Sequence, residues 1–305
     1  MSVPPTFSPE EHQFLRPRIR QVAARALAGG ALQPIVTNLH HVHQAGVRFV
    51  VRMLAPSLAA RSGQPQDHPT IARPTQPANP FLFPDPALLV ADLSPTHRCL
   101  LNKYPVVDEH LLVVTRAFEP QESLLTLADF AALVQCTRQI EGLAFYNAGP
   151  VAGASQRHKH LQLAPFPLDP AGVDAPIAPL LGAPGDPGRS VQSPHLPFHH
   201  ALRWLPPDQA TDAAYLLDAY RSLLLAADVW SGDAGDPRPY NWLATRQWML
   251  VVPRRAETVE QMPVNALGFA GSLLVRNAAQ LAWLRDYGPL NALCAVGVAR
   301  PDMAP

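Results

Sequence analysis

The 305-residue chain is poor in lysine and has no net charge. Only two of its 24 basic residues are lysines, Lys103 and Lys159, and 24 acidic residues balance the total. The general use of arginine suggests that these two positions need a compact ammonium group. A polynucleotide partner is not expected, because nucleic-acid binders usually carry a basic surplus. A small polyanion remains compatible, since it requires only a local cluster of cations.

Cysteines and long apolar runs are also scarce. The three cysteines, Cys99, Cys136 and Cys294, lie far apart and outside any CxxC pair, which argues against a disulfide framework or a Cys-rich zinc site. The chain has no run of about 18 apolar residues that would span a membrane, and its first residues lack the features of a signal peptide. We therefore expect a cytoplasmic protein with no membrane partner. Hydrophobic residues make up 48% of the chain, enough for one large or two modest globular domains.

Capping patterns and apolar periodicity predict the elements of an α+β fold. Ser8 and Thr126 each begin a capping-box pattern, with Glu11 and Asp129 three residues later, and each is expected to start a helix. Helices are predicted over 8–30, 126–146, 210–230 and 264–277, and strands over 46–54, 87–93, 97–107, 110–118, 158–166 and, as a hairpin, 240–255. These elements are mixed without regular βαβ alternation, which predicts a mostly antiparallel sheet with packed helices.

Two proline-rich stretches interrupt this pattern. Residues 55–87 and 167–197 each contain eight prolines. The first stretch is expected to form an irregular surface excursion. The second also contains several glycines and predicts a linker at 169–197, between an N-terminal domain (1–168) and a C-terminal domain (198–305).

The strongest chemical signal is the segment HKHLQ at 158–162. In a strand, residues two apart share a face and lie ~6.6–7 Å apart. His158, His160 and Gln162 are therefore expected on one face and Lys159 on the other. A neutral imidazole can attack phosphorus as a nucleophile, and a carboxamide beside it can stabilise charge that develops on phosphoryl oxygens.

The turn before this segment adds the capacity to bind an anion. It contains glycines with Ser155 and Gln156, and such turns aim backbone N–H groups at anions. A bare HxH pair is more often a metal site or a chance surface pair, but the shared face, the turn and the adjacent lysine together favour catalysis. A non-catalytic nucleotide- or zinc-binding module stays open as an alternative, although no cysteine lies nearby and Gln162 is a poor zinc ligand.

The run FYNAGPVAGASQRHKHLQLAPF (145–166) resembles the active-site segment of the histidine-triad (HIT-like) superfamily. It is most similar to the ATP adenylyltransferase, or diadenosine tetraphosphate phosphorylase, branch, whose members have an Asn-x-Gly turn, Gly-Ala-Ser-Gln and then His-x-His-x-Gln. Further similar stretches lie at 46–52, 79–97, 100–116, 196–202, 240–255 and 267–277, so the resemblance covers most of residues 46–290. The HxHxQ motif alone is shared with the galactose-1-phosphate uridylyltransferase (GalT-like) branch. The resemblance implies two related halves around the antiparallel sheet.

The resemblance also implies roles for individual residues. His160, the second histidine of the motif, is implied as the nucleophile, with His158 supporting it. Gln162 stands where the hydrolytic branch has a third histidine. The residues expected at the phosphates are Lys103, Asn147, Ser155 and Gln156, with Lys159, Arg52 and Arg254 as further candidates. Trp242 departs from the family pattern, where a smaller apolar residue is expected.

Histidines outside the motif receive structural interpretations. His40, His41 and His43 form an HHVH cluster, for which a surface turn is favoured over a metal site. His199 and His200 are close enough to a similar stretch to reach the site, but satisfied polar neighbours are the more common outcome for such residues.

The reaction implied by the resemblance is phosphorolysis in two displacements. The nucleophile takes AMP from diadenosine tetraphosphate and releases ATP, and inorganic phosphate then takes the AMP as ADP. Adenylyl-sulfate phosphorolysis through the same intermediate stays open, and uridylyl transfer is a lesser rival. No covalent cofactor or protein-bound metal is expected, and Mg²⁺ would only accompany the polyphosphate. The expected partners are small nucleotides and phosphate, and the sequence leaves the oligomeric state open.

Overall fold

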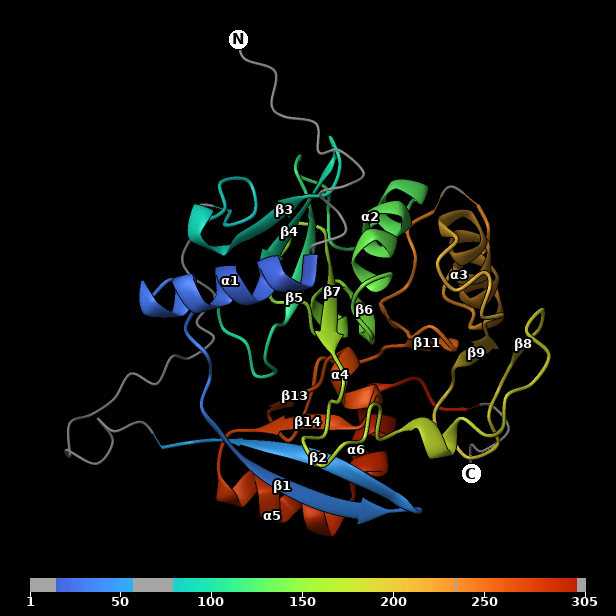
Figure 1. Cartoon of the computed structure of the whole chain (residues 1–305). Helices are drawn as coiled ribbons and strands as arrows, with labels where there is room; N and C mark the ends of the chain where they lie inside the picture. Colours follow the sequence, from blue (N-terminus) through green and yellow to red (C-terminus); the bar gives the residue numbers. More distant parts are fainter. Residues whose placement is uncertain (1–14, 57–78, 234, 301–305) are drawn as a thin grey trace.

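The computed structural model describes residues 15–56, 79–233 and 235–300, and its largest feature is a nine-stranded sheet (Figure 1). The strand order is β3-β4-β5-β7-β6-β10-β11-β9-β8, and all neighbouring strands are antiparallel. These strands are β3 (Leu89–Asp92), β4 (His97–Leu101), β5 (Leu111–Thr115), β6 (Gly142–Ala148), β7 (His160–Pro165), β8 (Ser190–Val191), β9 (Ala201–Trp204), β10 (Tyr240–Ala244) and β11 (Trp248–Pro253).

The remaining strands form two smaller sheets. One has the order β1-β2-β14, from β1 (Thr37–Gln44), β2 (Val47–Leu54) and β14 (Ser272–Val275), and the other pairs β12 (Thr258–Val259) with β13 (Met262–Pro263). The α-helices are α1 (Leu15–Ala28), α2 (Leu127–Thr137), α3 (Ala213–Ala226), α4 (Ala266–Phe269), α5 (Ala278–Tyr287) and α6 (Pro289–Val296). Short 3₁₀ helices cover Pro86–Leu88, Pro150–Ala152 and Ala178–Leu180.

The large sheet is built from two copies of one β-β-α-β-β unit. The first unit runs β4-β5-α2-β6-β7 and the second runs β8-β9-α3-β10-β11. In the sheet their strand orders mirror each other, and they meet at β6 and β10, where Asn147 pairs with Asn241. The predicted α+β fold, with a mostly antiparallel sheet and two related halves, is confirmed.

Different layers cover the two faces of the large sheet. Helices α1, α2 and α3 pack on one face around a core that includes Phe130, Tyr220 and Trp242. The β1-β2-β14 sheet and helices α4 to α6 cover part of the other face, around a core that includes Phe145 and Phe269 (Figure 1). Trp242, which departs from the expected family pattern, is therefore accommodated in this core, where it is one of the largest fully buried side chains.

The proline-rich segment 169–197 is packed against the second core. Ile177 and Leu180 are buried there, and β8, which lies within this segment, forms one edge of the large sheet. The nine-stranded sheet thus contains strands from both predicted domains. The division into two domains, 1–168 and 198–305, stays a prediction from the sequence.

Helix α2 begins as predicted but ends early. Thr126 accepts from the Asp129 backbone N–H, and the Asp129 side chain accepts from the Thr126 N–H, so the capping box is present. The prediction that this helix continues to Tyr146 is wrong, because 142–148 form the central strand β6. Gly142 permits the close strand packing: a Cβ at this position would lie 2.4 Å from the Ala164 carbonyl oxygen.

The predicted helix over 264–277 is also wrong. Helix α4 stops at Phe269, and Gly271 turns the chain with a φ of +94°, a value that favours glycine. The following residues form β14, which pairs in parallel with β2.

Other predicted boundaries shift in detail. The helix over 210–230 and the hairpin over 240–255 are confirmed as α3 and β10–β11. The strand predicted over 97–107 ends at Leu101 and continues as a loop. The predicted capping box at Ser8 and most of the excursion at 55–87 lie outside the described residues.

Candidate active site

His160 begins β7 and presents a defined tautomer. Its Nδ1 lies 2.8 Å from the His158 carbonyl oxygen, and because a carbonyl only accepts, the proton is on Nδ1 and the Nε2 lone pair is free. The side chain is buried, and burial lowers the pKa of His160 to about 4, against the opposing effect of the hydrogen bond to His158. At neutral pH this ring is therefore an uncharged imidazole with an available nucleophilic nitrogen.

The fully buried side chain of Gln121 fixes the backbone at the nucleophile. The His160 N–H donates to Gln121 Oε1 at 2.9 Å, and Gln121 Nε2 donates to the carbonyl oxygens of His160 (3.2 Å) and Asn147 (2.9 Å). The pairing of β6 with β7 ends at Phe145–Gln162. Beyond that pair the two strands separate, and the Gln121 carboxamide makes the hydrogen bonds that a backbone peptide group would make between them.

His158 is also buried, but both of its ring nitrogens are occupied. The Phe81 N–H donates to Asn79 Oδ1, so Asn79 Nδ2 is the end that donates to His158 Nδ1, at 2.9 Å. His158 Nε2 in turn donates to the Thr115 carbonyl oxygen at 2.8 Å. His158 therefore lacks a free lone pair, which favours a supporting role for it over a nucleophilic one.

The two histidines and Gln162 share one face of the sheet, as predicted. The Phe81 ring contacts both imidazoles, with centroids 5.7 Å from His158 and 5.1 Å from His160. Strand β5 places Val114 opposite His160 and Leu112 opposite Gln162. A small apolar cluster, which we call the apolar floor, therefore lies beside the nucleophile; it consists of Phe81, Leu100, Leu112 and Val114.

Lys159 lies on the opposite face and is fully buried. Its Nζ donates to Asp129 Oδ2 (2.8 Å), Glu119 Oε2 (3.0 Å) and the Leu124 carbonyl oxygen (2.9 Å), which uses all three of its donors. Burial alone would raise the pKa of Asp129, but the hydrogen bond from His97 and the charge of Lys159 lower it to about 2. The structure thus places Lys159 in the core behind the nucleophile strand, away from the expected phosphate site.

Arg254 is also a core residue. It is 4% exposed, and all five of its N–H donors are used, by Asn241 Oδ1 and by the carbonyl oxygens of Ala152, Ala256, Val264 and Val296. Burial lowers its pKa to about 9, so the guanidinium is still charged at neutral pH. With no donor left over, Arg254 supports the turn at Ala152 and does not lie free at a phosphate site.

Asn147 joins the nucleophile's surroundings to the second half of the chain. Its Oδ1 accepts from Asn241 Nδ2 (2.8 Å) and from the Ala266 N–H (2.9 Å), while its backbone carbonyl accepts from Gln121. Because the oxygen of the carboxamide is fully engaged, Nδ2 is the end that remains for an anion.

Three further predicted residues lie in loops or turns with available polar groups. Ser155 and Gln156 follow the 3₁₀ turn at 150–152 and make no side-chain hydrogen bond with the part of the chain that the structure describes. Lys103 is half-buried in the loop between β4 and β5, with its Nζ over the ring of Tyr104.

Arg52 lies on β2, at some remove in the fold from the nucleophile strand. Its Nη2 donates to the Leu168 carbonyl oxygen, and its Nε is buried without a partner among the described residues. Burial lowers the pKa of Arg52, opposed by the charges of Asp108 and Asp169. Asp108 belongs to the same loop as Lys103, so Arg52 lies near this loop.

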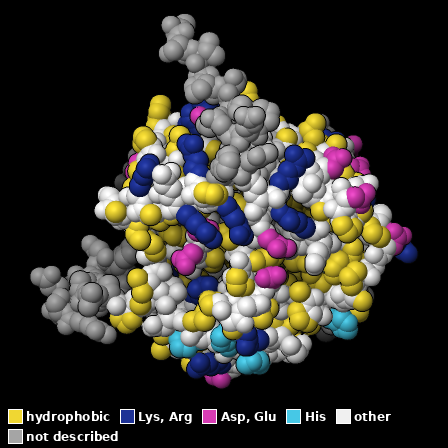
Figure 2. Space-filling view, in the orientation of Figure 1, with side chains coloured by type: hydrophobic (Ala, Val, Ile, Leu, Met, Phe, Trp, Pro, Cys, Tyr) yellow, Lys and Arg dark blue, Asp and Glu magenta, His cyan; other side chains and the backbone are white. Residues whose placement is uncertain are grey.

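The HHVH cluster forms part of β1, and the predicted surface turn is wrong. Residues 37–44 pair along their whole length with β2, so His41 and His43 share one strand face with Arg48. His41 and Arg48 both contact the buried carboxylate of Asp169. Figure 2 shows histidine and arginine side chains gathered over these two strands.

His200 is a satisfied core residue. Its Nδ1 donates to the Phe198 carbonyl oxygen and its Nε2 accepts from the Ser193 N–H, both at 2.8 Å. His199 lies near Gln192 and Asp228. The hydrogen bonds and ion pairs of both residues are made with partners outside the HKHLQ segment.

Geometry does not support the zinc-binding alternative. Both nitrogens of His158 and Nδ1 of His160 are held by protein partners, so the two rings cannot share a metal ion. No group of three or more His, Cys, Asp or Glu side chains within the described ranges is arranged to hold a metal. Among the same residues, no helix has the length and apolar character needed to cross a membrane.

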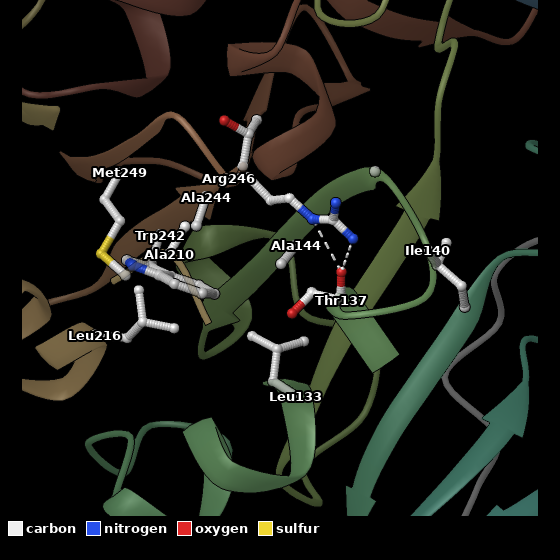
Figure 3. Close-up of a pocket in the computed structure, with 12 residues that line it drawn as sticks. Leu133, Thr137, Ile140, Ala144, Ala210, Leu216, Trp242, Ala244, Arg246 and Met249 are labelled. Atoms are coloured by element: carbon white, nitrogen blue, oxygen red, sulfur yellow. Dashed lines mark hydrogen bonds between the residues drawn. The ribbon is translucent and has the colours of Figure 1, made fainter. Parts of the chain in front are cut away.

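A separate pocket opens on the opposite side of the large sheet, between α2, α3 and the β10–β11 hairpin (Figure 3). Leu133, Trp242 and Met249 line it, and Arg246 at its rim donates to the Thr137 carbonyl oxygen. Its lining is mostly apolar and includes no residue of the HKHLQ segment, so it is distinct from the candidate active site.

A strand histidine with a free Nε2, held beside a carboxamide and a glycine-containing turn, has the geometry of a nucleophile. Two family models match this chain: the Ap4A phosphorylase N-terminal domain over residues 6–183, and the ATP adenylyltransferase C-terminal domain over residues 194–299. The chain therefore belongs to the Ap4A phosphorylase family of adenylyltransferases, where Ap4A is diadenosine tetraphosphate.

Individual relatives agree with this assignment. The chain is 30% identical over 263 residues to diadenosine 5',5'''-P1,P4-tetraphosphate phosphorylase 2 of Saccharomyces cerevisiae, covering 76% of this chain and 78% of that protein. Its fold is similar to the crystal structure of yeast Ap4A phosphorylase Apa2 in complex with AMP, with a TM-score of 0.77, 25% identity and coverage of 94% and 98% of the two chains. The corresponding structure of Apa2 in complex with Ap4A gives a TM-score of 0.75 at 25% identity, with coverage of 93% and 97%.

Proposed function

We propose that this chain catalyses the reversible phosphorolysis of diadenosine tetraphosphate to ATP and ADP, with His160 as the nucleophile. The observation that carries the proposal is the tautomer of His160: Nδ1–H is held by the His158 carbonyl oxygen, which leaves Nε2 unprotonated beside Gln162. Membership of the Ap4A phosphorylase family supports the choice of substrate.

In the first displacement, His160 Nε2 attacks the α-phosphorus of the dinucleotide. The new N–P bond forms as the bond from that phosphorus to the bridging oxygen breaks, and ATP leaves. The ring becomes positively charged as it is adenylylated, and its Nδ1–H donates more strongly to the His158 carbonyl oxygen, which stabilises this charge. Gln162 supplies an amide donor to the phosphoryl oxygens as their charge develops.

In the second displacement, an oxygen of inorganic phosphate attacks the same phosphorus. The N–P bond breaks, ADP departs and His160 recovers its lone pair. A covalent route divides one difficult step into two easier ones. The backbone of His160 must hold its position through both steps, and the clamp from Gln121 provides this.

The surroundings of His160 suit the remainder of the substrate. The apolar floor of Phe81, Leu100, Leu112 and Val114 suits an adenosine that is attached to the attacked phosphorus. Asn147, Ser155, Gln156 and Lys103 offer donors for the polyphosphate, with Arg52 near the Lys103 loop. Mg²⁺ would enter as a companion of the polyphosphate, and His160 itself needs no metal to be nucleophilic.

A product assay tests the proposal. The purified chain is incubated with diadenosine tetraphosphate, with and without inorganic phosphate, and the nucleotides are separated by chromatography. ATP and ADP in equal amounts, formed only with phosphate, are expected. Formation of ATP and AMP at the same rate without phosphate would instead identify a hydrolase. Parallel incubations with adenylyl sulfate and with a uridylyl donor measure the two rival activities.

A further inference from the structure

A second buried imidazole reaches the candidate site from the loop between β4 and β5. His110 is 4% exposed, and it accepts a backbone hydrogen bond from Asn102 that extends the β4–β5 ladder to this position. Leu112, two residues later, pairs directly with Gln162. Because residues two apart in a strand share a face, the His110 side chain lies on the catalytic face, diagonal to Gln162 and within reach of it.

The tautomer of His110 is fixed by its neighbour. The Tyr104 N–H donates to Asn102 Oδ1 at 3.2 Å, so Asn102 Nδ2 is the end that faces His110, 3.1 Å from Nδ1. His110 Nδ1 therefore accepts, and the ring proton is on Nε2. Burial lowers the pKa of His110 to about 4, with the neighbouring Gln162 side chain opposing the shift. The ring is thus neutral at physiological pH.

The donor capacity of His110 Nε2–H is not used elsewhere in the described part of the fold. This nitrogen is buried and lacks a hydrogen-bond partner among the described residues. A buried donor without a partner is unfavourable, because it has lost its hydrogen bonds to water, and the mechanism above makes no use of this group. The nearest polar side chain on the same face is Gln162, whose carboxamide lies close enough to interact with the His110 ring.

We propose that His110 is a positioning residue for Gln162: its Nε2–H donates to Gln162 Oε1 and directs the Gln162 amide Nε2 toward the phosphoryl group on His160. The inference rests on the proposed function, because it concerns how Gln162 assists the same transfer. The two ends of a carboxamide have nearly the same shape, but only the amide end attracts a phosphoryl oxygen. With the oxygen end turned inward, the same side chain would repel the developing charge.

This arrangement connects the reaction centre to the Lys103 loop. Lys103 lies between Asn102 and Tyr104, the two residues whose hydrogen bond fixes the orientation of the Asn102 carboxamide. The same turn therefore positions Lys103, which is proposed to bind the polyphosphate, and orients Gln162 through Asn102 and His110.

A double-mutant cycle tests the coupling in the full-length protein. The substitutions are His110→Asn, His110→Gln, Gln162→Ala and His110→Asn combined with Gln162→Ala, with kcat and KM for diadenosine tetraphosphate measured for each. The side-chain nitrogen of glutamine occupies a position like Nε2 of histidine, whereas that of asparagine occupies a position like Nδ1. His110→Gln should therefore retain the donor and most of kcat, and His110→Asn should lose it.

We expect His110→Asn to lower kcat by at least about 10-fold with little change in KM, and Gln162→Ala to lower it by about 10²-fold. The double variant should be no slower than Gln162→Ala, since His110 acts only through Gln162. Losses that multiply in the double variant, or a His110→Gln variant as slow as His110→Asn, would overturn the proposal. Wild-type turnover separately tests the proposed function.

A second route covers the case in which His110→Asn does not fold. Asn102 is half-buried, and Asn102→Ala removes the hydrogen bond to His110 Nδ1 that fixes the His110 tautomer. The His110 ring itself stays in place. We expect a partial loss of kcat that disappears in the Gln162→Ala background, with thermal denaturation confirming that each variant is folded. An Asn102→Ala loss that persists in that background would contradict the role assigned to His110.

Discussion

At the scale of single residues, a hydrogen-bonded neighbour decides which nitrogen of each imidazole carries the proton. Two asparagines, Asn79 and Asn102, each accept from the backbone N–H two residues later and donate to a histidine Nδ1. His158 and His110 are thereby fixed as Nε2–H tautomers, while His160 alone among the three donates from Nδ1. The proposed chemistry thus depends on two asparagines, each of which stands in an Asn-x-aromatic pattern in the sequence.

This difference in tautomer predicts which histidine becomes labelled. In a reaction with dinucleotide labelled at the α-phosphorus, wild-type protein should acquire acid-labile, alkali-stable label, and His160→Ala should acquire none. His158→Ala should slow labelling without moving its site, because its contacts with Thr115 and Asn79 shape the position of His160. Label on the His160→Ala variant would contradict the assignment. Peptide mapping of the labelled wild type provides the positive control.

The two carboxylates that contact Lys159 provide a matched pair for a stability test. The Asp129 side chain is 1% exposed and that of Glu119 is 44% exposed. Asp129→Asn should lower the free energy of unfolding by about 3–5 kcal/mol, because it leaves buried charge uncompensated. Glu119→Gln should cost less than about 1 kcal/mol, since solvent screens that pair. Urea denaturation measures both values, and equal effects would show that Lys159 is not held mainly by Asp129.

At the scale of secondary-structure elements, the sequence predicts which face of the HKHLQ strand each side chain lies on better than it predicts the contacts that surround this strand. Alternation in HKHLQ correctly predicts the shared face of His160 and Gln162, and the capping box correctly predicts where α2 begins. The sequence does not reveal that Gln121 replaces a peptide group between β6 and β7, because that contact joins segments far apart in the chain. The apolar residues of 142–148 fit a helix or a strand equally well until Gly142 packs against β7.

The sequence does not distinguish a buried structural cation from one that binds phosphate. Lys159 and Arg254 lie in or near motifs that resemble phosphate-binding segments, yet both have every donor occupied by protein oxygens. Composition shows that a cation is present, but its partners are set by tertiary packing. Lys103, by contrast, lies in a loop and keeps its ammonium group clear of carboxylates.

Arg254 and its neighbour allow a test at the level of the elements that they connect. Arg254 joins the turn at Ala152 to β10 and α6, whereas Arg255 is exposed and donates to carbonyl oxygens at the end of α6. Arg254→Met should reduce the free energy of unfolding by about 3 kcal/mol or more, because five acceptors lose their donor. Arg255→Met should change it by roughly 0.5 kcal/mol or less. Chemical denaturation of the two variants checks the ranking, and a reversed order would refute it.

At the scale of the whole molecule, the two β-β-α-β-β units differ in how they use histidine. In both units a histidine Nδ1 donates to the carbonyl oxygen two residues earlier, at His160 and at His200. In the second unit the Ser193 N–H occupies Nε2, so His200 has no lone pair for chemistry. Of these two histidines in the similar units, His160 is thus the one whose Nε2 has no backbone N–H donating to it among the described residues.

Buried neutral histidines predict how stability depends on pH. Burial lowers the pKa of His110, His160 and His200 to about 4 in the folded protein, while the unfolded chain has the ordinary value near 6.5. As pH falls from about 6.5 to 4, the unfolded state binds about three more protons than the native state, and the free energy of unfolding decreases. The stabilisation from Asp129 is lost only at lower pH, as its pKa is about 2.

Calorimetry from pH 7.5 to 4.5 measures this dependence. Tm should fall steadily below pH 6.5, and His200→Gln, which lies outside the candidate site, should reduce the pH slope by about one proton. A Tm that is constant between pH 7 and 5 would show that these rings titrate normally in the folded protein.

The pairing of β2 with β14 has a consequence for how the chain is made. β2 ends at Leu54 and its parallel partner begins at Ser272, so on a ribosome that adds about 5–20 residues per second the strand waits roughly 10–40 s for its partner. During that interval β2 lacks its contacts with β14 and α5, so the apolar side chains of Phe49 and Val51, both fully buried in the finished fold, are incompletely covered. Asn147, already synthesised, likewise waits for Asn241 and Ala266. The nucleophile strand is thus translated at mid-chain, but its site is complete only after the last elements emerge.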